Sequence, residues 1–171
     1  MSTYQRLIAV SLKMYLDPRQ TLAWSSAVAD LASRHQAVRS GQTQLLVIPS
    51  LPVLGNVEQL LTPAGVMVGA QDLFWEDRGA FTGAVSGADL AQIGCRFAEV
   101  GHAERRSIFA ESDDIVRRKV AAAVRNGMTP LLCIGEPTPG PADQAIAFCQ
   151  AQLASALAQF ADADDPVSVA V

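Results

Sequence analysis

Short apolar runs alternate along this chain with longer stretches in which apolar residues recur at helical spacing. The short runs hold four to seven mostly apolar residues, which is too few for a helix and typical of strands buried on both faces. They occupy residues 7–10, 45–48, 66–70, 97–100 and 128–134, and residues 167–171 begin a sixth. The pattern therefore predicts six strands separated by helices.

Five helices are expected between these strands, each introduced by a recognisable first residue. Asp17 followed by Pro18 and Gln20 is typical of an N-cap, a first helical position and a capping box. The other helices begin near Ser50, Ser86, Ser112 and Pro141. In the first helix, the helical spacing predicts a core-facing stripe of Trp24, Ala27, Val28 and Leu31.

Strands that alternate with helices predict a parallel sheet with helical crossovers. Two architectures fit this order: an open doubly wound sheet and an interrupted (β/α)8 barrel. No glycine-rich dinucleotide or phosphate-loop fingerprint follows the first strand, which favours the barrel. We find no boundary to a second domain, so residues 1–171 are expected to form one domain.

Composition and charge narrow the possible classes of function. A net charge of −4 argues against a general nucleic-acid or anionic-membrane surface. Cys95, Cys133 and Cys149 lack metal-ligand spacing and are interpreted as free thiols in a reducing compartment. Since the chain has neither an 18-residue apolar run nor a signal-peptide pattern at its start, we expect a cytoplasmic protein.

Charged side chains gather where two of the strands end. Gly101 after the fourth strand is followed by His102, Glu104 and two arginines, and Lys13 follows the first strand. In parallel α/β folds the ligand lies beyond the carboxyl ends of the strands. By composition alone the histidine cluster is more often a salt-bridged corner, and the lysine is as readily a surface side chain.

The connection from Gln71 to Val85 is long for a compact domain and carries Phe74, Trp75 and Phe81. Long internal loops are usually functional or mobile, and aromatic residues are enriched in protein interfaces. A protein contact and a loop folded onto its own domain are both consistent with this pattern.

Four segments in order resemble the triosephosphate isomerase family along nearly the whole chain. They are Leu12-Lys13-Met14, Gly69-Ala70-Gln71-Asp72 leading into Gly79-Ala80-Phe81-Thr82-Gly83, Gly101-His102-Ala103-Glu104-Arg105-Arg106, and Cys133-Ile134-Gly135-Glu136. The resemblance implies a TIM (β/α)8 barrel that is incomplete as printed, with about five and a half βα units where the fold has eight.

The resemblance also implies an activity: interconversion of glyceraldehyde 3-phosphate and dihydroxyacetone phosphate through an enediolate, in glycolysis and gluconeogenesis. His102 would be the electrophile, Lys13 the cation that binds the substrate, and Glu104 a partner of Lys13. Ser11 would contribute to the substrate site, and the reaction would need neither a metal nor an organic cofactor. A homodimer is implied as well, with Gln71, Phe81, Thr82 and Gly83 in the loop that reaches the neighbouring subunit.

Departures from the family pattern cluster near the implied substrate. The family usually has Asn at the position of Ser11, often Trp at that of Leu12, and Ser at that of Ala103. A related phosphosugar, such as a four-carbon ketose phosphate, is therefore an alternative substrate.

The family's glutamate base follows the sixth strand and is missing from the printed chain, as are the phosphate-binding loops after the seventh and eighth strands. We expect a parent protein heavier than 18.1 kDa. The alternative is a non-catalytic fragment that serves as a binding or assembly module. Open strand edges make a stable solitary fragment unfavourable.

Overall fold

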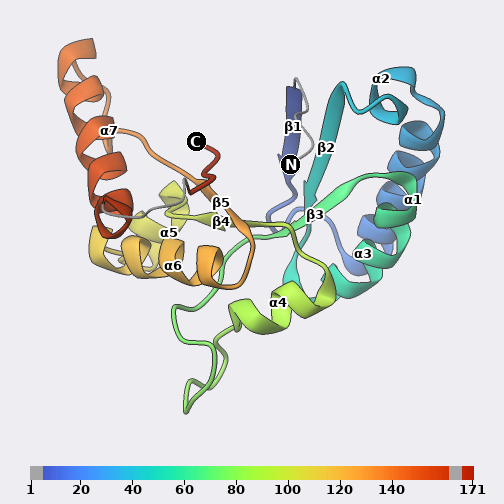
Figure 1. Cartoon of the computed structure of the whole chain (residues 1–171), viewed down its shortest axis with the longest axis horizontal. Helices are drawn as coiled ribbons and strands as arrows, with labels where there is room; N and C mark the ends of the chain where they lie inside the picture. Colours follow the sequence, from blue (N-terminus) through green and yellow to red (C-terminus); the bar gives the residue numbers. More distant parts are fainter. Residues whose placement is uncertain (1–5, 162–166) are drawn as a thin grey trace. The chain divides into compact units, whose positions relative to one another are not determined.

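The computed structural model describes residues 6–161 and 167–171, which fall into two compact units. The first unit comprises the described residues of 6–71 and 90–96, and the second those of 72–89, 97–161 and 167–171. Figure 1 labels the helices and strands of both units, and each unit is described by itself.

The first unit contains three parallel strands, β1 (Arg6–Ser11), β2 (Thr43–Ile48) and β3 (Met67–Ala70). Ile8 is aligned with Leu45, and Leu46 with Met67. The connections hold α1 (Pro18–Arg34), α2 (Gln36–Arg39) and α3 (Leu54–Leu61), with 3-10 turns η1 (Leu51–Val53) and η2 (Thr62–Ala64) on either side of α3. Parallel strands with helical crossovers are the predicted arrangement.

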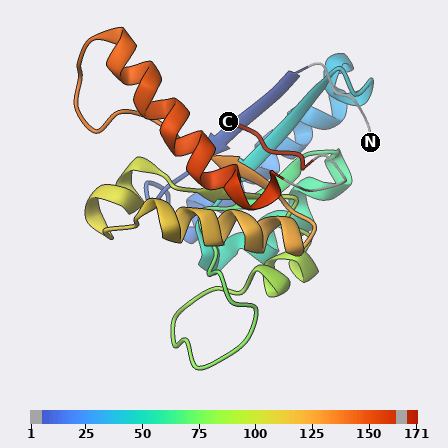
Figure 2. The same cartoon turned by 60° about the vertical axis from the view of Figure 1, so that its left-hand side comes forward.

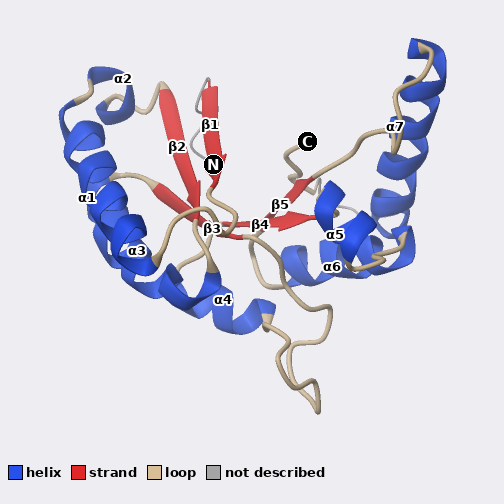
Figure 3. Cartoon of the chain, turned by 180° about the vertical axis from the view of Figure 1, so that it is seen from behind, coloured by secondary structure: helices blue, strands red, loops and turns tan. Residues whose placement is uncertain are grey.

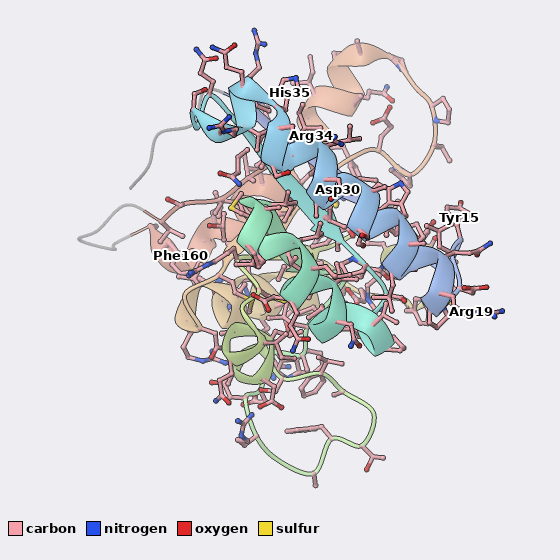
Figure 4. The ribbon with its side chains drawn as sticks, turned by 90° about the vertical axis from the view of Figure 1, so that its right-hand side faces the viewer. Tyr15, Arg19, Asp30, Arg34, His35 and Phe160 are labelled. Atoms are coloured by element: carbon pink, nitrogen blue, oxygen red, sulfur yellow. The ribbon has the colours of Figure 1, made fainter. Side chains whose placement is uncertain are left out.

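Helix α1 begins as the sequence predicts. Asp17 accepts a hydrogen bond from the Gln20 amide at 2.8 Å, and the Gln20 side chain accepts one from the Asp17 amide at 3.0 Å. This reciprocal pair satisfies two amide groups that the first helical turn leaves free. Figure 4 shows the whole helix from Tyr15 and Arg19 near its start to Asp30, Arg34 and His35 at its end.

The predicted core stripe of α1 is wrong. The buried residues are Thr21, Ser25 and Ala32, whereas Leu31 is 65% exposed. Helix α1 contacts α3 closely, and small side chains allow two helix backbones to approach. The larger apolar residues therefore lie on the flank of this contact.

The apolar core of the first unit lies between β2, β3 and the helix that connects them. Leu46, Ile48, Leu54, Leu61 and Val68 are each at most 1% exposed. By contrast, the prediction that residues 7–10 are buried on both faces is wrong, because Ile8 is 58% exposed. Strand β1 is paired with β2 on one side only in the described part of the chain.

The second unit contains two parallel strands, β4 (Phe97–Val100) and β5 (Thr129–Leu132), aligned from Phe97–Thr129 to Val100–Leu132. Helices α5 (Ala103–Ile108) and α6 (Asp113–Arg125) connect them, and α7 (Ala142–Leu157) with the 3-10 turn η3 (Ala158–Phe160) follows β5. Helix α6 packs against α7, as Figure 2 shows. Helix α4 (Gly87–Ile93) links the two units in sequence.

The sixth strand is present only as a single pairing. Ala170 forms a parallel bridge with Leu131, in which the Leu132 amide donates to the Ala170 carbonyl at 2.8 Å. Residues 167–169 have no strand assignment. The segment is therefore bonded to β5, in the order expected for a sixth strand.

One side of α7 is apolar and open to solvent. A groove of about 300 Å³ on this side is lined by Ile134, just beyond β5, and by the α7 residues Ala145, Ile146, Cys149, Gln150 and Leu153. Ile146 is 58% exposed, whereas Ala156 near the helix end is 1% exposed. The apolar side of α7 is therefore exposed near Ile146 and buried at Ala156.

Candidate active site

The segment after β4 turns sharply and places His102 at the start of α5. Gly101 has φ +73°, and a Cβ atom there would lie 3.1 Å from an Arg106 nitrogen and 3.2 Å from Val116. Both the backbone conformation and the space therefore favour glycine. His102 is the N-cap residue of α5, although the sequence had indicated no helix here.

The orientation of the His102 ring is fixed by a hydrogen bond from the helix backbone. The Glu104 amide donates to His102 Nδ1 at 3.2 Å. Because Nδ1 is the acceptor, a neutral ring carries its proton on Nε2. His102 therefore has one nitrogen engaged by the helix and the other able to donate to a substrate oxygen.

Glu104 lies on the same turn, with a carboxylate oxygen 3.4 Å from His102 Nδ1 and a side chain that is 53% exposed. The expected partnership of Glu104 with Lys13 joins residues of different units and stays a prediction.

The two arginines of the motif are used to build the fold. Arg106 Nε donates to the Gly101 carbonyl at 2.8 Å, and its Nη1 pairs with Asp113 at 2.6 Å. Arg105 pairs with Glu111 at 2.5 Å and with Asp72 at 2.9 Å. The salt-bridged corner expected from composition therefore describes the two arginines. His102 beside them instead accepts a hydrogen bond from the helix backbone.

A cluster of four charged side chains, two buried and two half-buried, lies behind this corner. It consists of Asp72 before the aromatic loop, Arg105 on α5, Glu111 between α5 and α6, and Lys119 on α6. Lys119 is 3% exposed and bonds to both Asp72, at 2.6 Å, and Glu111. Burial raises the pKa of Asp72, and the nearby Lys119 opposes that rise. The cluster joins the loop after β3 to the helices that carry the histidine.

Lys13 belongs to the first unit and has an unusual backbone. Its φ is +50°, a conformation that residues other than glycine rarely adopt. Gln71 Nε2 donates to the Lys13 carbonyl at 3.0 Å and to the Ile48 carbonyl at 3.3 Å. Gln71 was expected in the dimer loop, and the structure gives it a role that the sequence analysis missed: it ties the lysine segment to the end of β2.

Ser11, the other predicted substrate-binding residue, is the last residue of β1 and is aligned with Ile48. Ser11, Lys13 and Gln71 therefore lie at the carboxyl ends of their strands in the first unit. His102 and Glu104 lie at the corresponding end of β4 in the second.

The predicted dimer loop is attached at its base and open at its tip. Arg125 pairs with Asp77 at 3.0 Å, and Arg118 lies over the Trp75 ring at 4.2 Å. Phe74 contacts Phe81 with ring centroids 4.6 Å apart, yet Phe81 is 42% exposed. Figure 3 shows the loop extending from the second unit. Thr82 and Gly83 at the tip are exposed as well.

The sequence analysis also missed Glu99, which lies within the apolar run of β4. Its side chain is 7% exposed, and its Oε1 lies 3.9 Å from His102 Nε2 and 3.8 Å from Cys133 Sγ. A carboxylate inside an otherwise apolar strand is the signal by which Glu99 could have been found.

The described residues contain neither a cluster of metal ligands nor a helix that could span a membrane. Across residues 6–161 and 167–171, no three or more His, Cys, Asp or Glu side chains converge as metal ligands would. The helices of these ranges are all too short or too polar to cross a bilayer.

Comparison with known proteins gives consistent matches. The model of the family described as triosephosphate isomerase matches residues 6–171. An L-erythrulose-1-phosphate isomerase of Pectobacterium atrosepticum is 49% identical over 157 residues, which are 92% of this chain and 61% of that protein. An L-erythrulose-1-phosphate isomerase of Rhizobium etli is 41% identical over 75% of this chain and 47% of its own length.

A triosephosphate isomerase of Thermoanaerobacter pseudethanolicus is 35% identical over 76% of this chain and 50% of its own length. The chain thus spans about half to three fifths of the length of these three relatives.

Proposed function

Because the chain belongs to the triosephosphate isomerase family, we propose that it supplies the electrophile and the substrate cation of a sugar-phosphate isomerase. The observation that carries this proposal is the hydrogen bond from the Glu104 amide to His102 Nδ1. It leaves the Nε2–H of a neutral imidazole as the donor, which is the established arrangement in triosephosphate isomerase itself.

The reaction moves a carbonyl group to the neighbouring carbon. A base removes the proton from the carbon beside the carbonyl, and the electrons pass to the carbonyl oxygen, which becomes an enediolate oxygen. His102 Nε2–H donates to that oxygen, where charge develops. A proton then reaches the enediolate oxygen, the hydroxyl on the neighbouring carbon gives up its proton and becomes the new carbonyl, and the base returns its proton to the former carbonyl carbon.

Lys13 is the proposed cation for the negative charge of the substrate. Its left-handed backbone and its attachment through Gln71 support a fixed position for the main chain that carries the ammonium group. The family resemblance assigns the base to a glutamate after the sixth strand, in the part of the relatives' length that this chain does not span.

For the substrate, we propose a four-carbon ketose phosphate of the L-erythrulose 1-phosphate type. The 49% identity over 92% of the chain to a protein of that name supports it, together with the altered positions Ser11 and Ala103. The triose phosphate is the second candidate, since several relatives bear the name triosephosphate isomerase.

A homodimer formed through the loop of residues 71–85 belongs to the same proposal. The exposure of Phe81 at the tip of a loop whose base is fixed by ion pairs supports it. A cytoplasmic location stays a prediction.

Isomerase activity tests the proposal directly. In the full-length protein, proton exchange at the reacting carbon of both sugar phosphates is measured by NMR for the wild type, Lys13→Ala and His102→Gln. We expect each substitution to lower kcat/KM by at least about 100-fold, as for loss of a group that stabilises transition-state charge. Arg34→Gln at the end of α1 is the control, with unchanged turnover. Wild-type activity in either site variant would refute the roles assigned here.

A further inference from the structure

Glu99 places a carboxylate at a position in β4 where an apolar side chain could be buried at a lower free-energy cost. It is the third residue of β4, between Ala98 and Val100, which are both completely buried. Burying a carboxylate is unfavourable unless it is bonded, and replacement of buried charges by apolar residues often stabilises a protein. The Cys133 thiol is one bonding partner, 3.8 Å from Glu99 Oε1, whereas an apolar residue at this place would need none.

The Glu99 carboxylate lies close to the His102 nitrogen that is proposed to take part in the reaction. Glu99 Oε1 lies 3.9 Å from His102 Nε2, the nitrogen proposed to donate to the substrate. This distance is too long for a hydrogen bond, but it allows the two groups to reach oxygen atoms on neighbouring carbons of one small molecule. Cys133, just beyond β5, lies 3.8 Å from the same oxygen, so the carboxylate is at the carboxyl ends of β4 and β5.

The two candidate substrates differ at the end away from the phosphate. In both, the two reacting carbons lie at the same positions counted from the phosphate group. The outer reacting carbon of the triose bears no further carbon, whereas in a 1-phosphorylated four-carbon ketose it bears a hydroxymethyl group. That additional hydroxyl must give up water on binding and needs an acceptor. An ionised carboxylate accepts hydrogen bonds and donates none.

We propose that Glu99 determines substrate size: its carboxylate accepts a hydrogen bond from the hydroxyl group that a four-carbon ketose phosphate has and a triose phosphate lacks. This inference rests on the proposed function. Glu99 thus favours the larger substrate by a hydrogen bond that the smaller one has no hydroxyl to make.

The test compares two substrates in the full-length protein. Turnover of L-erythrulose 1-phosphate and of dihydroxyacetone phosphate is measured for the wild type, Glu99→Val and Glu99→Gln. Valine suits the strand, and glutamine retains an acceptor oxygen without the charge. Glu58→Gln on α3 removes a carboxylate elsewhere and is the matched control. Circular dichroism and urea unfolding show whether each variant is folded.

We expect Glu99→Val to lower kcat/KM for the four-carbon substrate on the order of 100-fold. For the triose phosphate it should change kcat/KM by less than about threefold, since that substrate makes no bond to the carboxylate. Glu99→Gln should fall between Glu99→Val and the wild type. Parallel losses for both substrates, or no change for either, would overturn the inference.

Binding separates this inference from the proposed function. Isothermal titration calorimetry gives the affinity of the same two phosphates for the wild type and Glu99→Val. If the wild type turns over neither substrate but binds the four-carbon phosphate more tightly, and Glu99→Val loses that preference, the isomerase proposal fails and the role of Glu99 stands. Equal binding of both phosphates, or binding of neither, would refute the role of Glu99.

Discussion

At the scale of single residues, the sequence predicted which side chains follow the strand ends better than it predicted their bonding partners. His102 and Lys13 follow their strands as expected, because a glycine or the end of an apolar run marks the turn. The uses of Arg105 and Arg106 were not predictable, since their partners Asp72 and Asp113 come from other elements. Glu99 was missed because one polar residue does not alter the apolar character of a strand.

Cys95 allows a prediction about chemical reactivity. It is 3% exposed, and burial raises the pKa of its thiol to about 12, so almost no thiolate is present near neutral pH. At about pH 8, iodoacetamide should leave Cys95 unmodified in the folded protein and modify it in urea. Peptide mass spectrometry reads both states. Equally fast modification in the folded protein would contradict the prediction.

Lys119 allows a prediction about stability. Lys119→Met leaves Asp72 and Glu111 with Arg105 as their remaining cation in the cluster, and breaking buried pairs in this way costs about 3–5 kcal/mol. Urea unfolding should show this loss. Arg117→Met, which removes an exposed partner of Asp114, should change the free energy of unfolding by less than about 1 kcal/mol. Equal losses in the two variants would show that burial of the cluster is not decisive.

At the scale of elements, capping chemistry made helix starts predictable, and missing neighbours made burial hard to predict. Asp17, Ser86 and Ser112 cap helices as expected, because their side chains bond local amides. The predicted core stripe of α1 and the predicted burial of β1 were wrong, since both depend on which other elements pack against them. The sequence marks an apolar face but does not say whether another element covers it.

The loop of residues 71–85 should contribute a pH-dependent part of stability through Asp77. Hydrogen bonds from Arg125 and Asn126 hold the pKa of Asp77 below its ordinary value of 3.8. A lowered carboxyl pKa means stability that is present above about pH 3.8 and is lost as the pH falls below it. Urea unfolding between about pH 2.5 and 6 should therefore be less pH-dependent for Asp77→Asn.

Arg125→Leu removes the stronger partner and should reduce the same pH dependence. Unchanged acid slopes in both variants would mean that the loop attachment does not depend on the charge of Asp77.

At the scale of the whole molecule, the fold class predicted from the sequence is confirmed: the chain belongs to a TIM-barrel family, and its strands are parallel with helical crossovers. The joint site of Lys13 and His102 stays a prediction, because the two residues belong to different units. That residues 1–171 act as one partial barrel domain is likewise a proposal. Local patterns specify the βα units, whereas the site depends on how many units come together.

The dimer is tested at this scale by sedimentation of the full-length protein. Thr82→Arg adds a charge at the exposed loop tip, where the subunit contact is proposed, and should convert a dimer into a monomer at micromolar concentration. Leu60→Ser, an exposed position on α3, should leave the dimer intact. A wild-type protein that sediments as an active monomer would refute the proposed dimer.

The cluster of Asp72, Arg105, Glu111 and Lys119 has a consequence for how such a sequence diverges. Each charge contacts two of the other three, so exchange of a single member unbalances a cluster of two positive and two negative charges. We therefore expect related sequences to change two of these positions together. The start of the loop after β3, at Asp72, should then vary in step with Arg105 on α5 and Lys119 on α6, although these helices come later in the chain.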